Sequence, residues 1–320
     1  LSATFLSLLV VSSLGYGVAD TWRSSVDDVL GTESVVVDDS QEGYFTSNYN
    51  SAEEMMAAAK AHAIKQGREG FVLMKNDNNA LPLSKDKEVA LFGAAAWAPY
   101  MQSSGDLKAG NADRVNLDDA LVNAGYTLNS QMEDIYTNIL ANYTVSSRFG
   151  NTTITYTNGY VTSPGDLANY QVREVPPDRY TDESLLTPDA DLGLTADDWI
   201  DIPSDWRQQM QATKADRVGI VVFARGAGES NTYKPGAGTT NFAGQTTDKD
   251  PLELSEDELA VIDAAKDTCS QVIVLLNTGN AMMIDDIAEG GSHEVDAIGY
   301  MGVINDYQCT GIVQVLSGEY

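Results

Sequence analysis

The run Val218-Gly219-Ile220-Val221-Val222-Phe223 and the later run Val272-Ile273-Val274-Leu275-Leu276 decide the fold class of this chain. Both runs are short, apolar and rich in β-branched residues, which is typical of strands buried on both faces of a parallel sheet. Between them, Ser255 and Glu258 have the spacing of a capping box that begins a helix. The core-facing side of that helix is expected to carry Leu259, Ile262, Ala265 and Cys269. Strand, helix and strand together predict a right-handed βαβ unit with a long first loop.

Outside this unit, further apolar runs extend the same pattern. Residues 89–92 and 295–300 are two more runs of the buried-strand type. We expect both to be parallel neighbours of the first two strands in one sheet. Helices are expected at residues 51–66 (ending at Gly67), 116–124 (with Asn116 as N-cap) and 310–316. The predicted fold class is α/β: a three-layer sandwich with an open, mostly parallel sheet flanked by helices.

Two segments depart from the α/β pattern. Residues 142–207 are rich in Thr, Tyr, Asn, Asp and Pro and show no sustained helical period, so they predict an insertion with irregular or short β-structure. Residues 1–19 carry no charge, and Gly17 and Ala19 are small residues at the −3 and −1 positions of a cleavage site before Asp20. Residues 1–19 are therefore expected to be a signal sequence or an uncleaved membrane anchor, which places the protein outside the cytoplasm. Residues 20–50 are expected to be an acidic linker.

The charge of the chain excludes several classes of partner. The 320 residues include 19 Lys and Arg against 47 Asp and Glu, for a net charge of −28. Such a chain repels phosphate backbones and anionic headgroups, so nucleic acid is not expected as a partner. Two His and two Cys are too few for a typical zinc-thiolate site. Whether Cys269 and Cys309 form a bridge or stay free is open at this point.

A crevice beyond the carboxyl ends of the strands is where open α/β sheets place their sites. Of the four loops expected there, the loop after Phe223 stands out because it presents the carboxylate of Glu229. Gly226 and Gly228 make the backbone before Glu229 flexible, and Ser230 follows it. A glutamate with this reach, in an environment that can tune its pKa, is a candidate general acid. The alternative is a solvated loop carboxylate, or a partner for Arg225.

Two other chemistries are disfavoured by missing motif residues. Gly226-Ala227-Gly228 lacks the third glycine of the dinucleotide-binding fingerprint, and no helix is expected to start there. No Gly-x-Ser-x-Gly motif occurs, and His62 and His293 are expected to be surface residues. Neither a dinucleotide site nor a Ser-His-Asp hydrolase is therefore expected.

Five segments in order carry a resemblance to a known family. They are residues 69–83, 89–93, 219–229 with an Arg-x-x-Gly-Glu pattern, 272–280 (VIVLLNTGN) and 295–302 followed by Leu316-Ser317-Gly318-Glu319. Together they resemble the α/β sandwich domain of glycoside hydrolase family 3. The matches span roughly residues 65–320, and the domain is expected over residues 51–320. The resemblance implies a retaining β-glycosidase, β-glucosidase-like, that needs no cofactor and acts on a carbohydrate substrate, with Glu229 as the acid/base. It also implies a nucleophilic Asp in a separate (β/α) barrel domain.

The resemblance is to members of the family with permuted domain order, in which the sandwich comes first. The barrel is therefore expected after residue 320, and this chain is expected to be a fragment that lacks it. The family pattern also changes locally, because Ser230-Asn231-Thr232 follows Glu229, Ser103-Ser104-Gly105-Asp106 replaces a Gly-Ser-Gly loop, and Ile304-Asn305 replaces Pro-Gly. The altered residues after Glu229 favour the alternative function, a catalytically silent carbohydrate-binding or scaffold protein, and the retained Glu229 opposes it.

Overall fold

The computed structural model describes residues 47–99, 114–141, 144–147, 150–153, 155–157, 160–162, 176–177, 202–225, 250, 252–279 and 281–320. By its contacts the chain divides into two units, Leu1–Ala52 and Glu53–Tyr320. The described strands all lie in the second unit, and so do the described helices, apart from Ala52, the first residue of α3 (Ala52–Gly70). Residues 1–46, which include the expected signal or anchor and most of the expected linker, are outside the described residues.

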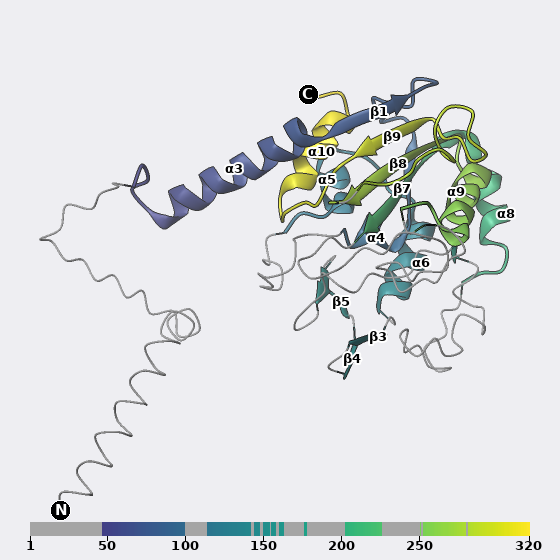
Figure 1. Ribbon diagram of the computed structural model, residues 1–320, viewed down its shortest axis with the longest axis horizontal. Coiled ribbons are helices and arrows are strands. Elements are labelled where there is room, and N and C mark those ends of the chain that lie inside the picture. The colour runs from purple at the N-terminus through teal and green to yellow at the C-terminus, as the bar shows by residue number, and fades with distance from the viewer. Residues whose placement is uncertain are drawn as a thin grey trace, which may run out of the picture. The chain divides into compact units, whose positions relative to one another are not determined.

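A five-stranded sheet with the order β1-β9-β8-β7-β2 forms the centre of the second unit (Figure 1). Its strands are β1 (Val72–Asn76), β2 (Glu88–Phe92), β7 (Arg217–Arg225), β8 (Gln271–Thr278) and β9 (Ala297–Tyr300). The last four are parallel neighbours, while β1 pairs antiparallel with β9. The α/β class and the four neighbouring parallel strands are therefore confirmed. The fourth strand begins at Ala297, two residues later than expected.

The two central strands are apolar because both of their faces are covered. Residues 217–224 of β7 and 272–278 of β8 are all buried. Helix α9 (Glu256–Thr268) and α8 (Trp206–Gln211) lie on one side of the sheet, and α10 (Gln308–Leu316) and α5 (Leu117–Asn123) lie on the other (Figure 1). Gly219 allows α9 to approach β7, since a Cβ at this position would lie 3.2 Å from the Sγ of Cys269.

Helix α9 begins with the expected capping box. The backbone N–H of Glu258 donates to the Ser255 hydroxyl at 3.2 Å, and the Ser255 N–H donates to the Glu258 carboxylate at 2.8 Å. These two bonds satisfy donors that the first turn of a helix leaves without a backbone acceptor. The expected core-facing residues are all buried, namely Leu259, Ile262, Ala265 and Cys269.

The predicted end of the first helix at Gly67 is wrong. Helix α3 (Ala52–Gly70) continues through Gly67, which is buried against α10. A Cβ on Gly67 would collide with the carbonyl group of Gln308, and one on Gly311 would collide with the carbonyl group of Ile64. The two glycines therefore let the backbones of α3 and α10 approach closely, and Gly67 serves this contact rather than ending the helix.

Several elements complete the described part of the chain. Helix α6 (Ser130–Ala141) and the one-turn α4 (Ala94–Trp97) were not expected. Within residues 142–207 the described parts include two short antiparallel hairpins, formed by β3 (Thr144–Ser147) with β4 (Gly150–Thr153) and by β5 (Thr155–Thr157) with β6 (Tyr160–Thr162). A short 3₁₀ helix, η4 (Lys214–Asp216), leads into β7. Of the described helices, none combines the length and the apolar character that crossing a bilayer requires.

Candidate active site at the carboxyl edge of the sheet

The four parallel strands bring their carboxyl ends to one edge of the sheet. There β2 ends at Phe92, β7 at Arg225, β8 at Thr278 and β9 at Tyr300. Sites of open α/β sheets form at this edge. Glu229, the one residue that the sequence nominates as catalytic, follows Arg225 by four positions and lies outside the described residues. The structure does place Arg225, where the loop that contains Glu229 begins. Arg225 ends β7, which lies between β2 and β8 in the sheet.

Two polar side chains end the apolar run of β8 at this edge. Asn277 pairs in register with Ala224 of β7, and Thr278 pairs with Arg225. Both Asn277 and Thr278 are fully buried. The amide Nδ2 of Asn277 donates to the carbonyl oxygen of Gly302 at 2.7 Å. Sequence reasoning missed Asn277, although a buried-strand run that ends in two polar residues at the site edge was a usable signal.

A second buried asparagine bonds to the one-turn helix α4, which follows β2. Asn116 is fully buried and precedes α5 as expected, yet its side chain makes no capping bond. Instead, its Nδ2 donates to the carbonyl oxygen of Trp97 at 3.1 Å. Trp97 is itself buried, and its indole N–H donates to the Leu91 carbonyl at 3.3 Å. Asn116 therefore connects the start of α5 to the turn that follows β2.

A third connection joins the approach to α5 with the loop after β9. The Nε of Arg114 lies 3.3 Å from the Oδ1 of Asp306, and the Val115 N–H donates to the Asp306 carbonyl at 2.8 Å. Both charged side chains are mostly withdrawn from solvent, with 12% and 24% exposed. Pairs shielded in this way are less weakened by water than surface pairs. The three connections join described segments beside the carboxyl end of β7, the strand that leads to Glu229.

Asp118 has an unusual carboxyl group, which the sequence analysis did not single out. It lies in the first turn of α5, and its Oδ1 is buried without a hydrogen-bond partner in the described part of the chain. Burial raises the pKa of the Asp118 carboxyl to about 7, and the neighbouring carboxylates of Asp119 and Glu133 add to the rise. A carboxyl with a pKa this high carries a proton for much of the time near neutral pH.

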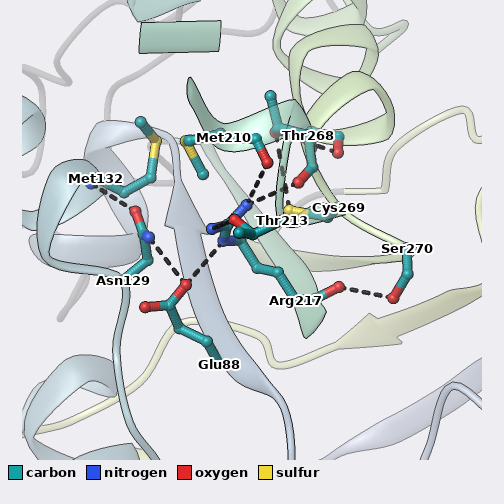
Figure 2. Close-up of polar contacts among 10 residues, drawn as sticks. Glu88, Asn129, Met132, Met210, Thr213, Arg217, Thr268, Cys269 and Ser270 are labelled. Atoms are coloured by element: carbon teal, nitrogen blue, oxygen red, sulfur yellow. Dashed lines mark hydrogen bonds and ion pairs between the residues drawn. The ribbon is translucent and has the colours of Figure 1, made fainter. Parts of the chain in front are cut away.

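The opposite edge of the sheet holds a buried cluster around Arg217 (Figure 2). Arg217 opens β7 and is 5% exposed. Its Nε donates to the Oε2 of Glu88 at 2.9 Å, and Nη2 donates to the Thr213 hydroxyl at 2.9 Å. Nη1 donates to the backbone carbonyls of Met210 and Thr268, at 2.9 and 3.0 Å.

Further bonds extend this cluster to α6. The Nδ2 of Asn129 donates to the Oε2 of Glu88 at 2.9 Å, and the Asn129 side-chain oxygen accepts from the Met132 N–H at 2.9 Å. The Ser270 hydroxyl donates to the Arg217 carbonyl at 2.7 Å. Because the cluster lies at the amino edge, away from the crevice position, its role is to hold β2, β7 and the surrounding helix ends together.

A Ser-His-Asp arrangement occurs on the surface, and its hydrogen bonds do not suit catalysis. Ser292 Oγ lies 2.9 Å from the Nδ1 of His293, whose Nε2 lies 3.4 Å from the Oδ2 of Asp263. The Ser292 hydroxyl donates to Asp286 at 3.1 Å. Because that hydroxyl has one proton, Nδ1 of His293 must be the donor toward it and cannot act as its base. His62 is exposed as expected, and His293 is partly exposed.

Both cysteines are free and buried, which resolves the alternative that the sequence left open. Burial raises the pKa of the Cys269 thiol to about 12 and raises that of Cys309 as well. A thiol must ionise to act as a nucleophile or a metal ligand, so neither side chain is suited to such chemistry. Among the described residues, no group of three or more His, Cys, Asp or Glu could hold a metal ion.

One comparison with known proteins identifies the family, and another supports the fold. Residues 71–320 match the glycosyl hydrolase family 3 C-terminal domain. Among solved structures, β-glucosidase 3B from Thermotoga neapolitana in complex with α-D-glucose aligns with a TM-score of 0.52 at 19% identity, over 85% of this chain and 30% of that chain. A β-glucosidase from Paenibacillus barengoltzii aligns with a TM-score of 0.52 at 22% identity, over 81% of this chain and 23% of its own. No curated protein matches. At these identities the structural likeness shows the fold, and this chain spans less than a third of either enzyme.

Proposed function

Because the chain belongs to glycoside hydrolase family 3 through its C-terminal domain, we propose that it is the sandwich part of an exported, retaining β-glycosidase acting on β-linked glucosides or a related sugar. Two similar structures are β-glucosidases, one of them with glucose bound, which supports a carbohydrate substrate. The chain spans 30% and 23% of those two proteins, so the proposal includes a (β/α) barrel domain of the same polypeptide that supplies the nucleophile.

Glu229 is the proposed acid/base. In a retaining mechanism, one carboxylate attacks the anomeric carbon while the acid, about 5–5.5 Å away, protonates the departing oxygen. The acid then deprotonates the water that hydrolyses the glycosyl-enzyme intermediate. The observation that supports this role is the course of β7, which reaches the carboxyl edge at Arg225, four residues before Glu229. The mechanism requires no cofactor.

Export is the second part of the proposal. The uncharged residues 1–19, with Gly17 and Ala19 before Asp20, fit a signal sequence or a membrane anchor. The protein would then meet its sugar outside the cytoplasm. Amino-terminal sequencing of the natural protein tests this step. A mature chain that starts at Asp20 supports cleavage, recovery with membranes supports the anchor, and a cytoplasmic chain that retains residues 1–19 would remove export from the proposal.

The rival function is a carbohydrate-binding or scaffold protein that has lost catalysis. The replacement of the residues after Glu229 by Ser230-Asn231-Thr232 favours it, and the retained Glu229 opposes it. The deciding experiment incubates the intact natural protein with a 4-nitrophenyl β-glucoside and follows the anomer first released by NMR. Release of the β-anomer supports the enzyme. Glucose binding without any release over a panel of β-linked sugars supports the rival and overturns the proposal.

A further inference from the structure

The side chain of Asn277 connects two neighbouring strand ends at the proposed active site. Asn277 is the seventh of the eight residues of β8, and its Nδ2 donates to the carbonyl oxygen of Gly302, two residues beyond the end of β9. The Met301 N–H donates to the Leu276 carbonyl at 3.0 Å, so β9 follows β8 to this point. Gly302 then turns the chain with φ 69°, a conformation that favours glycine.

A buried amide in the middle of a sheet is costly unless its polar atoms are bonded. Asn277 is fully buried and continues a strand whose preceding five residues are all apolar. An apolar side chain could fill such a position and would need no hydrogen-bond partner. What the amide adds is a directed bond, 2.7 Å long, that fixes where the Gly302 carbonyl lies.

That bond lies beside the strand that leads to Glu229. Asn277 pairs with Ala224, and Arg225 is the last described residue of β7. The carboxyl ends of β7, β8 and β9 are therefore adjacent. The Asn277 side chain sets the position of the chain after β9 relative to the end of β8. We propose that Asn277 is a positioning residue for the glycosidase reaction, which holds the loop after β9 against the exit of β8 beside the acid/base strand. This inference rests on the proposed function.

The expected consequence is on turnover more than on binding. Groups that align reacting atoms act within tolerances of about 1 Å, and a displacement of that size can cost about 10²-fold in rate. A shift of the loop after β9 changes the wall of the crevice beside β7, while most of the sugar contacts of a barrel-type site lie elsewhere. Loss of the bond should therefore lower kcat and leave KM nearly unchanged.

The test uses Asn277→Asp in the intact natural protein. Aspartate has the shape of asparagine but, when ionised, has no proton to donate, so its carboxylate would face the Gly302 carbonyl. When protonated, the same side chain can donate again. Asn129→Asp is the matched control, because Asn129 is also buried and donates at 2.9 Å, to Glu88, but at the amino edge of the sheet. Both substitutions are expected to destabilise the fold.

Two readouts are measured on both variants. For hydrolysis of an aryl β-glucoside, Asn277→Asp should lower kcat about 10-fold or more, relative to the unmodified protein at the same pH, once the pH is high enough to ionise its buried carboxyl. KM should stay within about threefold, and kcat should recover as the pH falls and the carboxyl regains its proton. Asn129→Asp should change kcat by no more than about twofold in the temperature range where it is folded. Hydrogen exchange should speed up at residues 301–307 in Asn277→Asp only. Asn277→Ala, which has no side-chain donor at any pH, replaces the aspartate variant if that variant fails to fold or keeps its proton over the whole pH range.

Each outcome supports or overturns the proposal. Equal effects of the two variants on kcat, or unchanged exchange at residues 301–307 in Asn277→Asp, would overturn it. If the unmodified protein hydrolyses no glycoside, the proposed function fails. The exchange measurement then still decides whether Asn277 fixes the loop, so the two failures are distinguishable.

Discussion

Glu88 and Arg217, the first residues of β2 and β7, are register partners in the sheet, and the Arg217 Nε donates to the Glu88 Oε2 at 2.9 Å. The ion pair therefore lies where the pairing of the two strands begins. Their side chains are 32% and 6% exposed, respectively, so the arginine is the member withdrawn from water. The buried guanidinium also donates to the carbonyls of Met210 and Thr268 and to the Thr213 hydroxyl, so it joins β2 and β7 to the ends of α8 and α9.

Replacing Arg217 should be strongly destabilising. Arg217→Met would leave the Glu88 carboxylate and the carbonyls of Met210 and Thr268 without their donors. Removing one partner of a buried charge pair costs roughly 3–5 kcal/mol. Urea unfolding should show a loss in this range, whereas Arg207→Met, which breaks a more exposed pair with Asp267, should cost less than about 1 kcal/mol. A loss below about 1 kcal/mol for Arg217→Met would contradict the structural role of the cluster.

Asp118 should make the protein less stable as the pH rises. Its pKa is raised to about 7 in the folded state, against about 3.9 in an unfolded chain. Between these values the folded state holds a proton that the unfolded state has released, so the free energy of unfolding falls as pH rises from about 4 to about 7. At about 1.4 kcal/mol per pKa unit, the loss is at most about 4 kcal/mol.

The substitution Asp118→Asn removes this titration. We expect the variant to lose less stability between pH 5 and pH 8 than the unmodified chain does, as measured by urea midpoints. Asp134→Asn, at an exposed position of α6, serves as the control and should leave the pH dependence nearly unchanged. Parallel curves for the unmodified chain and Asp118→Asn would show that the Asp118 carboxyl is ionised in the fold.

The two thiols should be unreactive in the folded protein. Cys269 and Cys309 are 2% and 0% exposed, and burial raises the pKa of both, so almost no thiolate is present at pH 8. Native protein should take up no iodoacetamide over an hour, and protein unfolded in guanidinium chloride should take up two equivalents without a reductant. A requirement for reductant would instead show a disulfide.

The chain of residues 1–320 by itself should not hydrolyse an aryl β-glucoside. One acid/base carboxylate lacks the nucleophile and the remaining walls of the sugar site that a retaining mechanism needs. The measurement is release of 4-nitrophenol by purified protein, with a commercial β-glucosidase as the positive control. Robust turnover would refute the proposal that the nucleophile comes from a second domain.

Sequence patterns predicted the central sheet because its strands are buried on both faces. The four parallel strands appear as short, mostly apolar runs, and the capping box at Ser255 and Glu258 marks the start of α9. Strand β1 shows the limit of this signal. Val72, Leu73 and Met74 form an equally apolar run, yet they lie at the edge of the sheet, antiparallel to β9, with 46–52% of each residue exposed.

Tertiary contacts explain what local patterns missed. Gly67 fits a helix end by its own preference, and only the approach of α10 makes it an interior residue. Asn116 is the expected N-cap residue of α5, but its side chain does not cap the helix. Its amide donates instead to the carbonyl oxygen of Trp97. Asn277 could be recognised as a polar residue at a strand end, while its partner Gly302 is 25 residues away and could not. Local sequence carries no information about contacts of this kind.

The central claim is that Glu229 is the acid/base of a retaining glycosidase, and chemical rescue of Glu229→Gln in the intact protein tests it most directly. Loss of general acid catalysis should lower hydrolysis of an alkyl β-glucoside by roughly 10²–10⁴. A substrate with a very good leaving group needs no protonation and should suffer much less in its first step. Glu289→Gln is the matched control, since Glu289 is also a loop glutamate beside a glycine.

Azide completes the measurement, because it attacks the glycosyl-enzyme intermediate without needing a base. We predict that azide restores turnover of the activated substrate in Glu229→Gln, with β-glucosyl azide as the product, and has no such effect on Glu289→Gln. A folding defect would slow every substrate alike and would not respond to azide. Turnover of the alkyl glucoside by Glu229→Gln within a few-fold of the unmodified protein would contradict the claim and favour the binding protein.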